Sequence, residues 1–142
     1  MLSGLPIDNN DALSRRDAGL EFLDVSSQVG AAPTGTHRTR DEQIDSYRLT
    51  NHGTAVVDTH LLVVVHGLPD GVQLRNASGM SRAGAPYLRL YLAGGVLLPG
   101  QSTPVRLRLQ RSAPGDRHVA AAYPDDEPVR YTLELLSGQG QP

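Results

Sequence analysis

The stretch LLPGQSTPVRLRLQ, residues 97–110, joins a Pro-Gly pair to a strict alternation of apolar residues with arginine. Proline presets the first central φ of a type II turn, and glycine supplies the positive φ of the second, so the pair predicts a chain reversal. After the turn, Val105, Leu107 and Leu109 point to one side of an extended chain and the arginines to the other. This pattern is typical of a half-buried strand in an antiparallel sheet.

Two further segments carry clear strand signals. Residues 129–136, VRYTLELL, repeat the alternation, and if they lie beside the first strand, Glu134 would face Arg106 or Arg108 across the pair. Residues 61–65, LLVVV, are an unbroken apolar run. This run is long enough for a strand buried on both faces and too short for a typical helix.

The rest of the chain fits an all-β fold. Shorter strand signals occur in four other segments: residues 20–29, 44–50, 72–74 and 85–92. The polar segment 30–43 is predicted to be a loop or a ragged edge, and 15 glycines and 10 prolines punctuate the chain. With almost no helical periodicity, we predict an antiparallel two-sheet β-sandwich, immunoglobulin-like, of about seven strands.

The length of 142 residues predicts one domain with a sizeable core. Residues 1–19 mix polar and charged residues with isolated leucines, which is typical of a flexible leader or linker. We therefore place the domain at residues 20–138, followed by a flexible tail at residues 139–142.

Composition argues against several classes of function. A formal net charge of −2 lacks the basic excess that nucleic-acid binding requires. The chain has no cysteine, and therefore neither a disulfide framework nor a thiolate metal site. No apolar run approaches the roughly 18 residues of a membrane span, and the first residues lack the apolar core of a signal peptide. Arginine without lysine, with abundant Ala, Gly and Pro, suggests GC-rich codons and a bacterial source.

A series of motifs resembles a known family. In order, YRLTNHGT, LLVVVHGLPDGVQLRNASG, AGAPYLRL, LLPGQSTPVRLRL and YTLELLSGQG resemble a bacterial immunoglobulin-like or fibronectin-III-like β-sandwich module of large secreted or cell-surface proteins. The resemblance covers about the last two thirds of the chain. It implies a non-catalytic accessory module that acts in spacing, docking or adhesion through protein partners or the other domains of its parent protein. It also implies a secreted or cell-surface location, with the export signal outside this chain.

The chain departs from that pattern in the segment 111–128, RSAPGDRHVAAAYPDDEP, where the family would have a short loop. Its acidic side chains could supply the oxygen ligands that calcium prefers, and the candidates are Asp116, Asp125, Asp126 and Glu127. The spacing matches no EF-hand loop, and the competing interpretation is a solvated acidic loop. Tyr123 is the candidate for contact with a sugar ring. A calcium- or carbohydrate-binding module is therefore the alternative function.

Other polar residues have structural interpretations. A second acidic group, Asp41, Glu42 and Asp45, is interpreted as the charged start of a strand. Asn76 is interpreted as a turn residue, and Tyr87 is expected to pack against the core.

No catalytic constellation emerges from the sequence. The five histidines form no His-Glu-x-x-His pair, and no Gly-x-Ser-x-Gly nucleophile elbow is present. We therefore predict that the protein is not an enzyme and has no cofactor, apart from possible calcium. An exposed strand edge that pairs with another chain would support docking over ligand binding.

Overall fold

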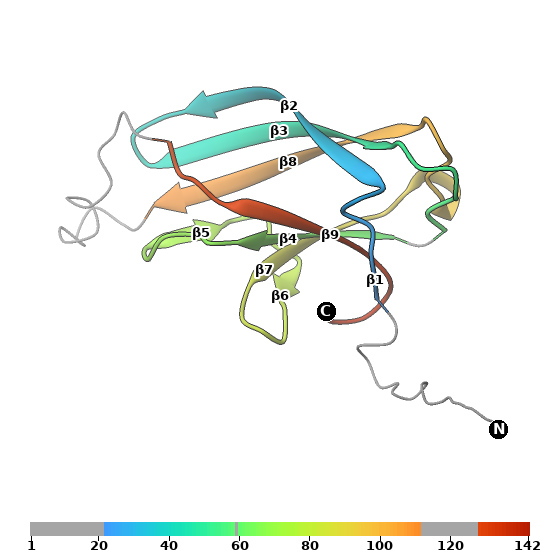
Figure 1. The fold of residues 1–142 in the computed structure, drawn as a ribbon. Helices are drawn as coiled ribbons and strands as arrows, with labels where there is room; N and C mark the ends of the chain where they lie inside the picture. Colours follow the sequence, from blue (N-terminus) through green and yellow to red (C-terminus); the bar gives the residue numbers. More distant parts are fainter. Residues whose placement is uncertain (1–21, 59, 112–127) are drawn as a thin grey trace.

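The computed structural model describes residues 22–58, 60–111 and 128–142. These residues form two antiparallel sheets, which Figure 1 shows as two facing layers. The five-stranded sheet has the order β1-β9-β4-β7-β6, and the four-stranded sheet has the order β2-β3-β8-β5. The strands are β1 Leu23–Asp24, β2 Val29–Arg38, β3 Glu42–Asn51, β4 Leu61–His66, β5 Val72–Leu74, β6 Gly79–Met80, β7 Pro86–Leu90, β8 Ser102–Arg111 and β9 Thr132–Ser137. The predicted all-β fold and two-sheet sandwich are confirmed.

The turn and strand that decide the fold lie where the sequence predicts them. Gly100 has a φ of 86°, and the N–H of Gln101 donates to the carbonyl of Leu98 at 2.9 Å, as in a type II turn. In β8 the alternate apolar side chains are buried and the arginines between them are exposed. This strand lies between β3 and β5 and carries one wall of the core.

Strand β4 explains why an unbroken apolar run occurs in the chain. Its side chains are buried alternately on the two faces of the sheet. Leu61, Val63 and Val65 belong to the main core between the sheets. On the other face, Leu62 and Val64 form a second cluster with Tyr87, which is buried as expected. Because neither face of β4 is exposed to solvent, its sequence has no polar residues between the apolar ones.

Of the two alternatives predicted for residues 30–43, the loop is wrong, and the ragged edge agrees with a bulged strand at the edge of a sheet. Most of that segment is β2, which pairs antiparallel with β3 from Val29 to Arg38, with a bulge between Pro33 and Gly35. Such a strand at the edge of a sheet is held by its backbone hydrogen bonds, and most of its side chains are exposed. Its sequence therefore carries no apolar alternation. The single strand expected over 20–29 is also wrong, because the chain leaves β1 and changes sheets before β2 begins.

The expected contact of Glu134 with Arg106 or Arg108 is wrong as well. Strands β8 and β9 belong to different sheets. Glu134 instead contacts His66 on β4, with 2.8 Å between the His66 Nε2 and a carboxylate oxygen. Arg108 pairs with Glu42, at 3.0 Å. Two strands of similar pattern need not be neighbours, since alternation shows which face is buried and not which strand lies alongside.

The last residues of the chain return to the turn region around β6. The backbone N–H of Arg82 donates to the carbonyl of Pro142 at 2.7 Å, and the side-chain amide of Gln141 donates to the carbonyl of Met80 at 2.7 Å. The flexibility of residues 139–142 stays a prediction. Within the described ranges, the structure has no helix with the length and apolar character that a membrane crossing requires.

Candidate functional site

The predicted ligand residues lie outside the part of the chain that the structure describes. This applies to the calcium candidates and to the sugar contact, namely Asp116, Tyr123, Asp125, Asp126 and Glu127. Their roles stay predictions. Over residues 22–58, 60–111 and 128–142, no three His, Cys, Asp or Glu side chains come together as ligands for a metal ion.

The second acidic group does not converge on one point. Glu42 and Asp45 are three residues apart on β3, and successive odd and even positions of a strand face opposite sides of a sheet. Glu42 reaches Arg108 on the outer face, whereas Asp45 hydrogen-bonds Tyr131 on the inner side. These residues mark the beginning of a strand, in keeping with the interpretation of the sequence.

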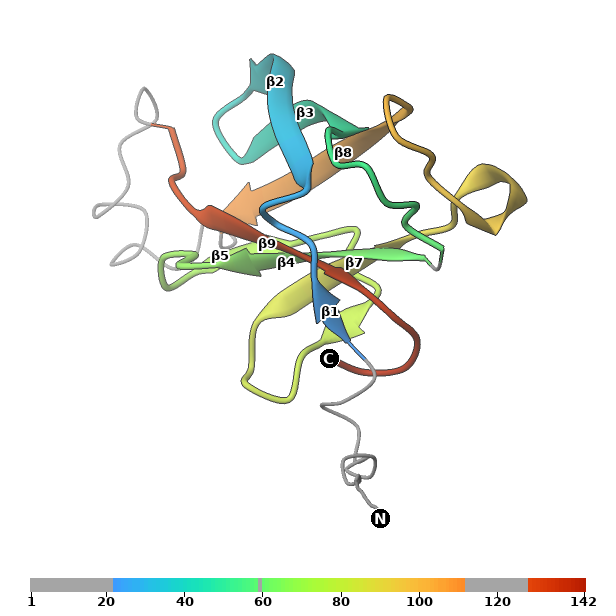
Figure 2. The ribbon, with the colours of Figure 1, turned by 45° about the vertical axis from the view of Figure 1, so that its right-hand side comes forward.

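The feature that stands out is the outer edge of β9. One side of this strand pairs with β4 from Thr132 to Ser137. On the other side, β1 pairs only with Leu136 and Ser137 (Figures 1 and 2). The next residue after β1, Val25, donates its N–H to the carbonyl of Leu135 at 2.9 Å. The chain then departs to the other sheet, so among the described residues no strand covers the first part of β9, up to Leu133.

At both ends of this edge, side chains form hydrogen bonds with the backbone groups. The Ser26 hydroxyl accepts from the N–H of Leu135 at 3.0 Å. At the other end, the side-chain amide of Gln43 donates to the carbonyl of Val129 at 3.2 Å and accepts from its N–H at 2.9 Å. A glutamine side chain carries the same donor and acceptor as a peptide group. Gln43 is only 5% exposed, and it replaces a missing strand at this position.

Tyr131 and Leu133 lie between these two ends. Tyr131 directly precedes β9 and Leu133 lies within it. Their half-buried side chains continue the alternation of the buried Val129 and Leu135, so we infer that the backbone groups of both residues point to the same open side. Within the described residues, no hydrogen bond joins their N–H and C=O groups to another strand or side chain along that edge. Considering the described residues alone, four backbone hydrogen-bonding groups in a row, the N–H and C=O of Tyr131 and Leu133, have no partner on this side.

A groove of about 630 Å³ opens beside this edge, between β2 and β3 on one side and residues 128–131 on the other. Its lining consists of Pro33, Gly35, Thr36, Arg38, Gln43, Asp45, Ser46, Tyr47, Pro128, Val129, Arg130 and Tyr131. The groove lies where the two sheets separate, so a chain at the edge could place a side chain between them.

A chain of hydrogen bonds forms the floor of the groove. Tyr131 donates to the carboxylate of Asp45, and therefore accepts from the Tyr47 hydroxyl, with 2.7 Å between the two oxygens. The same carboxylate accepts from the Thr36 hydroxyl at 2.6 Å and from the Gln43 amide at 2.9 Å. Donors from both sheets meet at Asp45, which fixes the separation of the sheets at this end.

Burial raises the pKa of Tyr131 well above its ordinary value, and the neighbouring Asp45 and Tyr47 raise it further. The hydroxyl therefore keeps its proton at neutral pH and serves as a donor. The chemistry of the arrangement is to hold the edge in place and to offer hydrogen-bonding groups.

The other strand edges of the described fold are short or interrupted. The edge strands β5 and β6 have three and two residues. The long edge strand β2 contains Pro33 and a bulge, which are devices that prevent pairing with another chain. The exposed edge of β9 has neither device at Tyr131 and Leu133.

Sequence reasoning missed Gln43, Tyr47 and the backbone of Leu133 as functional candidates. A signal for the first was present, because Gln43 occupies an inward position of the same alternation as Tyr47 and Leu49. A polar residue at a core position requires a partner.

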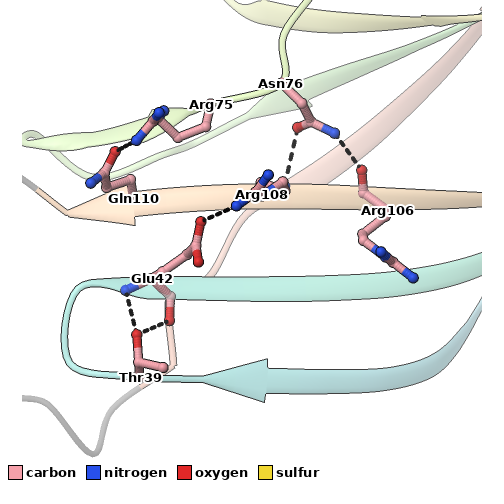
Figure 3. Close-up of polar contacts among 7 residues, drawn as sticks. All are labelled: Thr39, Glu42, Arg75, Asn76, Arg106, Arg108 and Gln110. Carbon is pink, nitrogen blue, oxygen red and sulfur yellow. Dashed lines mark hydrogen bonds and ion pairs between the residues drawn. The ribbon is translucent and has the colours of Figure 1, made fainter.

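Asn76 is confirmed as a structural residue, since its side-chain amide bonds the backbone of Arg106 and Arg108 on β8 (Figure 3).

Comparison with models of known protein families and with curated proteins finds no match. The inference of function therefore rests on the geometry of the described residues.

Proposed function

We propose that this domain is a non-catalytic interaction module that binds an extended peptide segment of a protein partner along the open edge of β9. The observation that carries the proposal is the row of backbone groups at Tyr131 and Leu133, bounded by Gln43 and Ser26. Strand addition of this kind supplies affinity through main-chain hydrogen bonds and specificity through alternate side chains.

A polypeptide is the ligand whose chemistry matches this edge. Donors and acceptors that repeat every second residue are matched by a second strand, which has the same repeat. Tyr131 and Leu133 direct their side chains toward the core, so inward residues of the added strand would enter the groove beside Tyr47. The remaining residues of the peptide would face solvent.

The wider role follows from the resemblance described above. The resemblance of the sequence motifs to immunoglobulin-like modules supports an accessory module of a bacterial secreted or cell-surface protein, in which the domain docks parts of a larger assembly. Calcium or glycan binding would depend on residues 111–128, most of which lie outside the described residues, and it stays a prediction.

The proposal can be tested with a phage-displayed library of twelve-residue random peptides selected on the purified full chain. Selected peptides are expected to be rich in β-branched and aromatic residues, which favour strands. On binding, they should slow hydrogen exchange at the amides of Tyr131 and Leu133. The amide of Gln73, on the edge strand β5, is the internal control and should not change.

Two results would overturn the proposal. One is a library that yields no peptide above background. The other is a bound peptide that leaves exchange at Tyr131 and Leu133 unchanged while it protects amides elsewhere, which would place peptide binding at another surface.

A further inference from the structure

The outer face of the four-stranded sheet carries a group of arginines that the proposed function does not use. Arg48 lies on β3, Arg106 and Arg108 lie on β8, and Arg75 follows β5. All four are exposed. The acidic residue on this face of β3 is Glu42, which pairs with Arg108. The face is therefore basic in a chain whose formal net charge is −2.

The strand register places these arginines side by side. Arg106 is opposite Ser46, and Arg48 is opposite Pro104, so Arg48 and Arg106 are diagonal neighbours about 7 Å apart. Arg108 follows Arg106 on the same face, also about 7 Å away. The N–H of Arg75 donates to the carbonyl of Arg108 at 2.6 Å, which makes these two residues cross-strand neighbours. The four arginines therefore form a band across β3, β8 and the end of β5.

Side chains of the same protein bind two of the four arginines in this band. Figure 3 shows Arg108 paired with Glu42, and Arg75 bonded to the side chain of Gln110. Within the part of the chain that the structure describes, no hydrogen bond or ion pair holds the guanidinium groups of Arg48 and Arg106. Arg48 and Arg106 therefore place two positive charges close together without a compensating contact from the described residues.

We infer that this basic band, defined by Arg48, Arg75, Arg106 and Arg108, is a second binding site, and that its ligand is an extended acidic segment of a protein. The guanidinium group is a planar donor that suits carboxylates. Acidic side chains on one face of an extended peptide repeat at about 6.6 Å, close to the spacing of Arg106 and Arg108. The outward positions of β3 and β8 carry no Tyr, Phe or Trp on which nucleobases could stack.

The test measures the binding of a fluorescein-labelled ten-residue glutamate peptide to the full chain by fluorescence anisotropy. The double variant Arg48→Gln/Arg106→Gln should bind at least about fivefold more weakly, because it removes two exposed ion pairs with the ligand. Binding to the wild-type chain should weaken as salt rises. Circular dichroism and the thermal midpoint should match the wild type, since neither guanidinium group supports the fold.

The matched control is Arg40→Gln/Arg82→Gln, which makes the same change in net charge at exposed sites outside the band and outside the groove beside β9. Equal affinity of the wild type and the Arg48/Arg106 variant would overturn the inference. So would an equal loss in the control, or tighter binding to heparin or duplex DNA that depends on the same arginines.

Discussion

Gln43 shows how one buried side chain can complete a strand. Its amide makes both hydrogen bonds to the backbone of Val129 and a third to Asp45. We predict that Gln43→Ala lowers the free energy of unfolding by about 2–3 kcal/mol, because it leaves buried backbone groups without partners. Urea denaturation measures this difference.

The matched control for that change is Gln73→Ala, an exposed glutamine on β5. Its effect should stay within about 0.5 kcal/mol, as for most surface substitutions. If the two alanine variants are equally stable, Gln43 does not replace the missing strand.

The raised pKa of Tyr131 predicts that the free energy of unfolding decreases at alkaline pH. Its pKa is raised in the folded state by burial and by Asp45, so the unfolded chain loses the proton first as pH rises. The contribution of Tyr131 is fully present below pH ~10 and decreases above it, by less than ~1.4 kcal/mol per pH unit because the ring is partly exposed. Urea midpoints between pH 9 and 11 should fall more steeply for the wild type than for Tyr131→Phe. Parallel curves would contradict this assignment.

Among the elements, the turn before β8 is the one that the sequence determines most completely. Gly100 has a φ of 86°, and a Cβ at this position would meet no atom within 4 Å, so only the backbone conformation opposes a side chain. We predict that Gly100→Ala costs about 1–2 kcal/mol in unfolding free energy. Thermal or urea unfolding provides the measurement.

Gly35 is the control for this substitution, because a side chain there would meet equally little steric hindrance. A Cβ there also meets no atom within 4 Å, but Gly35 does not have a positive φ. Gly35→Ala should therefore be neutral or slightly stabilising, because alanine restricts the unfolded chain. A loss for Gly35→Ala as large as that for Gly100→Ala would show that φ is not the cause.

Strands differed in how well the sequence predicted them. The strands that carry core residues, such as β4 and β8, were predicted because burial imposes an apolar pattern. The edge strand β2 was missed because backbone pairing with β3 holds it and most of its side chains are exposed. Pro33, which argues against a central strand, is compatible with this edge position.

Considering the whole molecule, the sandwich was predictable and its candidate site was not. Among the described residues, the edge is open at Tyr131 and Leu133 because β1 and the two residues after it cover only Leu135 to Ser137 before the chain crosses to the other sheet. That crossing depends on contacts between segments about a hundred residues apart, such as Ser26 with Leu135. Local alternation contains no information on such pairings. The basic band likewise required the register of β3 against β8.

Amide hydrogen exchange of the free protein, followed by NMR, will show whether the edge formed by Tyr131 and Leu133 is unpaired. The amide of Glu134 faces β4 and that of Leu135 is bonded to Ser26, so both should exchange slowly. We predict that the amides of Tyr131 and Leu133 exchange at least about tenfold faster than that of Glu134. Equal protection of Tyr131, Leu133 and Glu134 in the free monomer would contradict the account, because the edge would then already be occupied.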